Sequence, residues 1–136
     1  MNIGGIVGYS YGTVENCYNI GSVKAKLPVN LGAKQNEAIG GIAGQLHAGG
    51  ILKNSYTTGA VTGPETGIGS VIGMNSGTVE NTYVLENICT KTIATNDAQT
   101  GVSIRKKTAE EMREALFAYT LGAAYNQDNA ADSINN

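Results

Sequence analysis

A short glycine-rich pattern occurs three times in this chain, and this repetition constrains the fold more than any other feature of the sequence. Each copy opens on a segment such as Gly-Gly-Ile-Val-Gly and continues with one such as Gly-Thr-Val-Glu-Asn-Cys-Tyr. The paired segments occupy residues 4–8 and 12–18, 40–44 and 50–56, and 69–73 and 77–83. A single repeat of this size cannot bury its own apolar face, so we expect the copies to stack on one another.

The segments within each copy have the length and composition of strands. Runs of four to seven residues rich in Val, Ile and Tyr alternate with glycine-containing corners, and such short runs favour strand over helix. Equivalent strands of stacked copies run in the same direction and pair in parallel. The pattern therefore predicts an all-β fold, a parallel β-solenoid of about three coils.

The spacing between the copies places insertions at the corners of the coils. The second copy carries two extra residues around 45–49, and a longer insertion separates Val23 from Ile42. A solenoid permits insertions at corners because they leave the strand segments intact. We predict a three-repeat solenoid over 1–90, with repeats at about 3–24, 39–62 and 68–89, and a capping region over 91–136.

Equivalent polar and aromatic residues of the copies form columns along the predicted stack. One column is an amide ladder, in which the side chains hydrogen-bond along the axis, and a second is a stack of tyrosine rings. A third runs minus, plus, minus, which stabilises neighbouring strands that pair in register. The three columns are Asn16, Asn54 and Asn81; Tyr18, Tyr56 and Tyr83; and Glu15, Lys53 and Glu80.

Aliphatic residues form three further columns that we expect to point into the core. These columns are Val14, Leu52 and Val79; Ile6, Ile42 and Val71; and Val23, Val61 and Ile88.

The orientation of Cys17 has two readings. A strict period of two places it on the same face as Glu15, whereas a bend at Asn16 would turn it inward. Cys17 and Cys89 lie two coils apart, about 9–10 Å along a stack with about 4.8 Å per coil. A disulfide needs Cα atoms closer than about 7 Å, so we expect free thiols.

A helix is predicted over about 109–121. Thr108 followed by Glu111 forms a capping box, in which each residue's side chain accepts a hydrogen bond from the other's backbone N–H. Met112, Ala115, Leu116 and Tyr119 recur at helical spacing and form one apolar stripe. We expect this stripe to cover the open end of the solenoid, although a partner-binding helix would have the same pattern.

The motifs in residues 3–88 resemble the GLUG-motif repeat family. The matching signature is Gly-Gly-Ile-Val-Gly, then Thr-Val-Glu-Asn-Cys-Tyr-Asn, then a closing Gly-Ser-Val. The resemblance implies a right-handed β-helix and an extracellular or cell-surface location. Its members are secreted and surface-attached bacterial proteins, including adhesin-like proteins and immunoglobulin A peptidases. The motif carries no catalytic residue.

The residues that could form a metal or catalytic site each have a simpler interpretation, as a loop residue or as part of a structural column. His47 has no neighbouring His, Cys or acidic residues in the sequence that would complete a zinc site, and we read it as an exposed loop residue. The amide-rich tail with Asp128 and Asp132 lacks the Gly and bidentate Glu of a calcium loop. Glu15 and Glu80 have a spacing suitable for glycoside hydrolysis, but Lys53 lies between them, which favours a charge ladder. We expect no metal or other cofactor.

Net charge and hydropathy bear on the partners. The net charge is −2 and the few basic residues form no patch sufficient for nucleic acid, and no apolar run has the length of a membrane span. We expect a non-catalytic module of a larger protein that acts in adhesion or as a spacer. Its partners would be a host glycan or protein ligand and the neighbouring domains of its parent. The alternatives are an accessory domain of a secreted peptidase and, less favoured, a carbohydrate-active enzyme.

Overall fold

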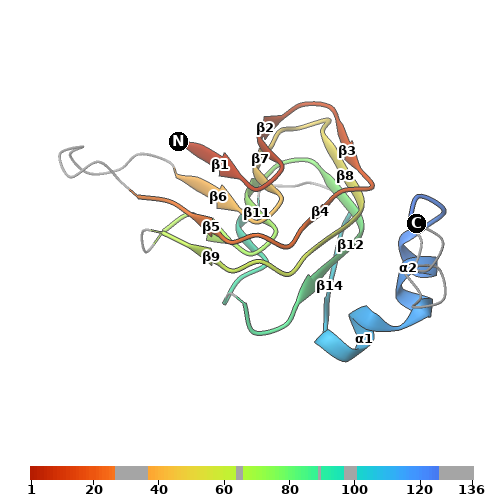
Figure 1. The fold of residues 1–136 in the computed structure, drawn as a ribbon. Helices are drawn as coiled ribbons and strands as arrows, with labels where there is room; N and C mark the ends of the chain where they lie inside the picture. Colours follow the sequence, from red (N-terminus) through yellow and green to blue (C-terminus); the bar gives the residue numbers. More distant parts are fainter. Residues whose placement is uncertain (27–36, 64–65, 89, 97–100, 126–136) are drawn as a thin grey trace, which may run out of the picture.

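Strands that pair in parallel are the main elements of the computed structural model, and two short helices follow them near the C-terminus (Figure 1). The structure describes residues 1–26, 37–63, 66–88, 90–96 and 101–125. All ten strand pairings in these residues are parallel. The expected all-β class with parallel sheets is confirmed.

Each sheet collects equivalent strands of successive repeats. The first contains β1 (Asn2–Gly4), β6 (Ala38–Gly40) and β10 (Ile68–Gly69). The second contains β2 (Val7–Ser10), β7 (Ala43–Leu46), β11 (Ile72–Asn75) and β13 (Ile93–Asn96). The third contains β3 (Thr13–Glu15), β4 (Tyr18–Asn19), β8 (Ile51–Thr57), β12 (Thr78–Leu85) and β14 (Val102–Lys107). The fourth contains only β5 (Val23–Lys24) and β9 (Val61–Thr62).

The pairing register follows the aligned repeats. Leu52 lies opposite Val14 on one side and Val79 on the other, which is the expected aliphatic column. Both Leu52 and Val79 are fully buried. Val23 pairs with Val61 as expected. A shift by one residue would turn every inward side chain outward, so the buried columns hold the strands in register.

Burial increases from the first repeat to the second. Ile6 of the first repeat is 45% exposed, whereas the equivalent Ile42 and Val71 are fully buried. The second repeat is covered by strands of other repeats on both sides, while no described strand covers the outer edge of the first. The exposed side of the first repeat therefore presents the same chemical pattern that the second repeat buries.

A glycine forms the tight corner between the first and second sheets. A Cβ atom on Gly40 would lie 2.0 Å from the carbonyl oxygen of Ala43, and one on Gly69 would lie equally close to that of Ile72. No side chain fits at such a distance. The glycine at the start of each motif is therefore required by the close approach of the backbone to itself.

Ile88 does not continue the Val23–Val61 column, which corrects the expectation from the sequence. The chain leaves β12 through a turn at Asn87, whose φ is 64°. Ile88 then packs against the core that contains Val71, Val79 and Val84. The third repeat has a Glu at the closing glycine position, and its chain turns inward instead of forming a third strand beside β9.

The strands continue past residue 90, where the sequence led us to expect the capping region. β13 pairs with β11, and β14 pairs with β12 over most of its length. Ile93 and Ile104 pack against the main core. These two strands add a fourth layer to two of the sheets.

The expected helix over 109–121 is two helices, α1 (Ala109–Arg113) and α2 (Ala115–Leu121). Glu114 between them is extended, with φ −70° and ψ 142°. The predicted apolar stripe is wrong, because Leu116 and Tyr119 are 67% and 85% exposed. The break at Glu114 rotates α2 so that Phe117 and Leu121 are buried instead.

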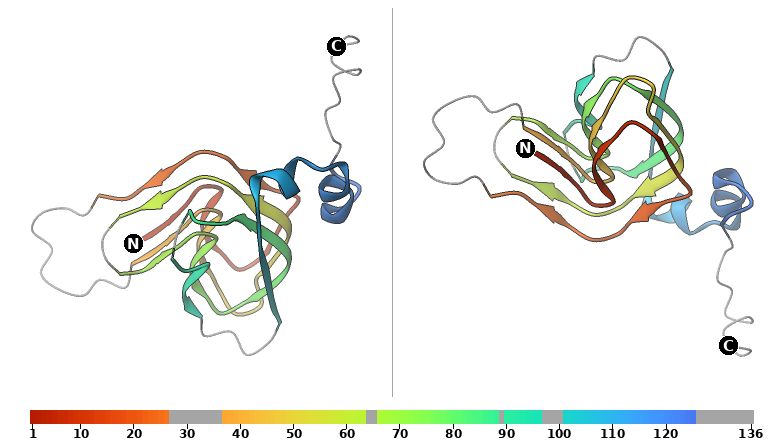
Figure 2. Two further views of the ribbon diagram at one scale, coloured as in Figure 1. Left: turned by 90° about the horizontal axis from the view of Figure 1, so that it is seen from below. Right: turned by 90° about the horizontal axis from the view of Figure 1, so that it is seen from above.

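The helices lie along the side of the stack and do not cover its end, which corrects the expected position (Figure 2). Phe117 and Leu121 pack against Tyr83 of the third repeat and Tyr56 of the second. Beyond α2, Tyr125 reaches the backbone of the first repeat. The tyrosines at this side form an apolar surface, and the helical segment buries it.

Some predicted features fall outside the described residues. They are Cys89, most of the long insertion after Val23, and the amide-rich tail from Asn126. Cys17 is a free thiol.

Candidate functional site

The asparagine column marks a bend in each repeat. Asn16, Asn54 and Asn81 have φ of 55°, 48° and 41°. Asparagine tolerates this left-handed conformation better than most residues. The bend interrupts the strand alternation, so that the residues before and after it face differently.

The bend decides the orientation of Cys17. The residues equivalent to Cys17 are Ser55 and Thr82, and both are buried. Each of the three side chains donates a hydrogen bond to the carbonyl two residues earlier, at 3.1 Å for Cys17 and 2.8 Å for Ser55. The backbone N–H of Cys17 also donates to Ser55 Oγ. Of the two readings of Cys17, the structure supports the inward one.

The amide ladder joins the second and third repeats. Asn81 Nδ2 donates to Asn54 Oδ1 at 2.9 Å and to the Thr120 carbonyl in α2 at 2.9 Å. Tyr83 donates from its hydroxyl to Asn81 Oδ1 at 2.8 Å. Within the described residues Asn16 makes no such amide contact. Asn81 therefore links two repeats and the helical segment.

The charge column contains one ion pair. Lys53 Nζ lies 3.0 Å from Glu15 Oε2, and both side chains are more than a third exposed. Glu80 lies opposite Lys53 in the register but forms no ion pair within the described part of the chain. Exposed pairs of this kind contribute at most about 1 kcal/mol. The alternating charges favour the observed order of the repeats.

The tyrosine column is interrupted after two rings. Tyr18 and Tyr56 stack with centroids 5.4 Å apart and planes 10° apart. Phe117 packs edge-on against both Tyr56 and Tyr83, at 5.6 Å and 5.2 Å. The ring of Tyr83 is buried under α2, and the outer face of the column ends at Tyr18, which is 54% exposed.

Tyr125 holds the C-terminal segment against the first two repeats. Its hydroxyl donates to the carbonyls of Asn54 at 2.8 Å and Cys17 at 3.1 Å. Burial raises the pKa of this hydroxyl above its ordinary value, so the group stays protonated and able to donate. The sequence analysis missed this residue, because nothing near it repeats and its partners are 71 and 108 residues away.

The predicted capping box is present at the start of α1. Thr108 Oγ1 accepts from the Glu111 N–H at 3.1 Å, and Glu111 Oε2 accepts from the Thr108 N–H at 2.8 Å. The Thr108 N–H, together with Lys107, holds the pKa of the Glu111 carboxyl below its ordinary value. The box orients the helical segment where it leaves β14.

An exposed aromatic cluster lies on the corner between the second and third sheets. The ring of Tyr11 lies 4.9 Å from that of Tyr9 and 4.4 Å from that of His47. Tyr9 and Tyr11 are 38% and 63% exposed, and His47 is half-buried. His47 sits in the insertion of the second repeat, which turns it toward the first. The sequence predicted an exposed loop residue at His47; the structure places it in a loop, half-buried and in contact with two tyrosines.

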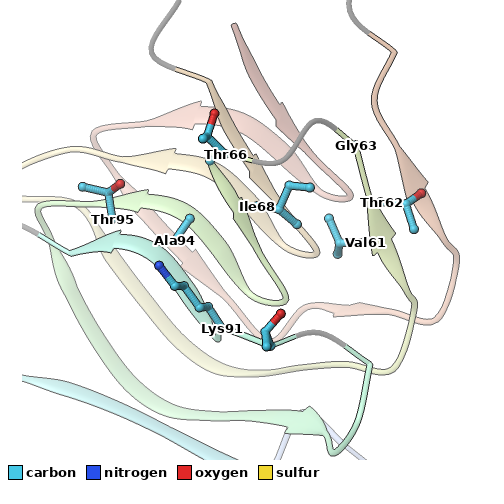
Figure 3. A pocket seen from close by; sticks show the side chains of 10 residues that line it. Val61, Thr62, Gly63, Thr66, Ile68, Lys91, Ala94 and Thr95 are labelled. Atoms are coloured by element: carbon cyan, nitrogen blue, oxygen red, sulfur yellow. The ribbon is translucent and has the colours of Figure 1, made fainter. Parts of the chain in front are cut away.

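A hollow of about 610 Å³ lies beside β9 (Figure 3). Val61 and Ile68 form its apolar part, and Lys91 is the one charged residue among those that line it. Threonines supply most of the remaining side chains: Thr62, Thr66, Thr90 and Thr95.

The described residues form neither a metal-ligand cluster nor a membrane-spanning helix. No group of three or more His, Cys, Asp and Glu side chains is close enough to hold a metal ion. No helix in the described part of the chain has the length and hydropathy to cross a membrane.

Comparison with known families finds one match, which covers two stretches of the chain. The model of the GLUG motif matches residues 1–24 and 35–62. These two stretches are the first two of the three copies, and they contain most of the columns described above. No curated protein and no solved structure matches the chain.

Proposed function

Because the chain contains repeats of the GLUG-motif family, we propose that it is a non-catalytic module of a larger secreted or cell-surface bacterial protein. The repeats form a right-handed parallel β-solenoid in this proposal. The module acts in adhesion or as a structural spacer.

One observation carries the proposal: equivalent residues of successive repeats pair in register across four sheets. Such a stack grows by adding repeats, and each repeat contacts only its neighbours. The exposed pattern of the first repeat, with Ile6, Tyr18 and Glu15 at the outer edge, suits contact with a further repeat or a neighbouring domain.

The adhesive role is favoured by the cluster of Tyr9, Tyr11 and His47. Exposed aromatic rings with polar tips are suited to contact with sugars and with protein surfaces. Asn2 and Gln45, which hydrogen-bond to each other at 3.0 Å, lie on the strands next to these residues and offer polar groups. A host glycan or protein is the ligand class we assign to this surface.

Binding of the purified domain to a glycan array and to a panel of host-surface proteins tests the adhesive role. We expect Tyr11→Ala to reduce binding at least about tenfold, as for an interface residue of major importance. Tyr119→Ala removes a more exposed tyrosine from α2 and should leave binding unchanged. If neither glycan nor protein binds the wild-type domain, the spacer role remains and the adhesive role is rejected.

The accessory domain of a secreted peptidase is the second candidate. An accessory domain and an adhesive module would have the same fold, so the neighbouring parts of the gene distinguish these two functions. A peptidase motif encoded beside this module would favour the accessory role, and a cell-wall anchoring signal would favour adhesion.

A carbohydrate-active enzyme is the least favoured candidate. The ion pair of Lys53 with Glu15 speaks against the use of Glu15 and Glu80 as a pair of free carboxylates. A reducing-sugar assay on polysaccharide substrates tests this directly. Sugar release that disappears in Glu80→Gln would overturn the non-catalytic proposal.

A further inference from the structure

The sheet of β5 and β9 has two strands, one fewer than the smallest of the other sheets. In each of the other sheets the strand of the second repeat lies between two partners, such as β6 between β1 and β10. In the described part of the chain β9 pairs with β5 alone. The cause is the inward turn at Asn87, which takes the third repeat into the core before a matching strand forms.

The free edge of β9 presents backbone groups ready for pairing. Val23 and Ala25 of the first repeat donate to the carbonyls of Ala60 and Thr62, both at 2.9 Å. Successive residues of a strand direct their peptide groups to opposite sides. The N–H and carbonyl of Val61 therefore point away from β5, toward the position where a third strand would lie. Edges of this kind pair readily with an added strand.

The hollow of about 610 Å³ lies at this same edge, and it has a size typical of ligand sites. Figure 3 shows the side chains of Val61 and Ile68 close together, with Lys91 and Ala94 on the neighbouring segment of chain. Val61 and Val23 belong to a core cluster separate from the main one, and Ile68 packs against it. An added strand with an inward valine would extend the Val23–Val61 column by one position.

The lining of the hollow selects among possible ligands. Lys91 is exposed and forms no ion pair within the described residues, so it favours a carboxylate partner. The residues that line the hollow include no aromatic ring on which a sugar could stack. Among the described strands β9 pairs with β5 alone, and its other edge suits a ligand with its own peptide groups.

We propose that this edge of β9 is a binding site for an extended acidic peptide, which adds as a strand beside Val61 and places a carboxylate near Lys91. The site is separate from the Tyr9–Tyr11–His47 surface. It operates whether the module serves as an adhesin or as a spacer.

The test uses the whole chain and three synthetic peptides. The first is acetyl-Glu-Ser-Val-Thr-Glu-amide, whose two glutamates offer a carboxylate in either strand direction. The second has glutamine for both glutamates. The third is the first peptide with N-methyl groups on valine and threonine, which removes the donor that faces the Val61 carbonyl in an antiparallel or a parallel strand and keeps the side chains. Amide hydrogen exchange by NMR reports on strand addition, and calorimetry reports on affinity.

We expect the first peptide to slow the exchange of the Val61 amide and to bind about fivefold more tightly than the glutamine peptide, since one exposed charge pair supplies at most about 1 kcal/mol. Lys91→Gln should remove this difference. Lys106→Gln, which changes an exposed lysine on β14, should preserve it. The N-methylated peptide should not protect Val61.

Three results would overturn the proposal. The first is unchanged exchange at Val61 with millimolar peptide and a folded protein. The second is equal binding of the N-methylated peptide, because binding would then not use the strand edge. The third is binding of trigalacturonate at Lys91 without binding of the acidic peptide, which would assign the hollow to an acidic sugar.

Discussion

Three asparagines occupy equivalent bends of the three repeats, and their side chains have different partners. Asn81 bonds to Asn54, Tyr83 and the Thr120 carbonyl, whereas Asn16 shares the backbone conformation and makes none of these side-chain contacts. Conformation and side-chain bonding are therefore separable in this column. Substitutions at Asn16 and Asn81 therefore measure separately how much the backbone conformation and the side-chain hydrogen bonds contribute to stability.

Substitution at Asn81 should be more costly than at Asn16. We expect Asn81→Gly to lower the free energy of unfolding by about 1–2 kcal/mol, through lost hydrogen bonds alone. Asn81→Ala should cost about 1 kcal/mol more, because alanine is strained at positive φ. At Asn16, which makes none of these side-chain bonds, only the strain of alanine at positive φ applies. Urea unfolding of the glycine and alanine variants at both positions gives the comparison, and equal losses for Asn81→Ala and Asn16→Ala would contradict the assigned bonds.

At the scale of elements, the C-terminal helices depend on contacts at both of their ends. The capping box holds the start of α1, and Tyr125 holds the chain beyond α2. Between them Phe117 and Leu121 bury the tyrosine surface. The break at Glu114 lets each helix meet its own contacts, which a straight helix could not do.

Removal of the Tyr125 hydroxyl should loosen this segment. Tyr125→Phe removes the hydroxyl donor from the Asn54 carbonyl, while the Cys17 carbonyl still accepts from the Tyr56 N–H, and we expect a loss of about 1–2 kcal/mol in thermal or urea unfolding. Tyr119→Phe is the matched control, because Tyr119 is 85% exposed. Identical stability of the Tyr125→Phe variant and the wild type would mean that the hydroxyl contributes nothing.

The capping box should weaken in acid. The folded state holds the pKa of Glu111 below its ordinary value, so its contribution is complete above an unfolded pKa of about 4.3 and is lost as the pH falls through the lower folded value. We expect the helical far-UV signal to decrease below about pH 4.3. Glu111→Gln should already have a reduced signal at pH 7 and show a smaller decrease; an acid transition as large as that of the wild type would exclude Glu111 as its source.

At the scale of the whole molecule, the charge column helps to order the repeats. Glu15, Lys53 and Glu80 lie at equivalent positions of neighbouring strands, so a change of one sign alters two neighbours at once. These charges are partly exposed, and salt screens them. The core columns hold the register, and the charges add a smaller preference.

Reversal of the central charge should destabilise the stack. Lys53→Glu would place three carboxylates in consecutive repeats, and we expect a loss of about 1 kcal/mol in low salt. The loss should shrink in about 1 M NaCl, where the Debye length is about 3 Å. Lys53→Gln controls for the lost pair without repulsion. A loss that salt does not reduce would point to packing of the lysine stem.

Much of the fold follows from the sequence, because repeats impose the same local choices several times. The strand segments, their parallel pairing, the Val14–Leu52–Val79 column and the Thr108–Glu111 box are all readable from spacing. Each depends on neighbours within a repeat or on identical positions in the next one. Repetition therefore makes the long-range contacts predictable from local pattern.

Only the tertiary structure decided the features that break the repetition. The inward turn that takes Ile88 into the core, the break at Glu114, and the side-on position of the helices each depend on packing between unlike segments. So do the contact of His47 with Tyr11 and the reach of Tyr125 to Cys17. These contacts carry no periodic signal, since each forms once between residues far apart in the chain. They also create the two candidate binding surfaces of the molecule.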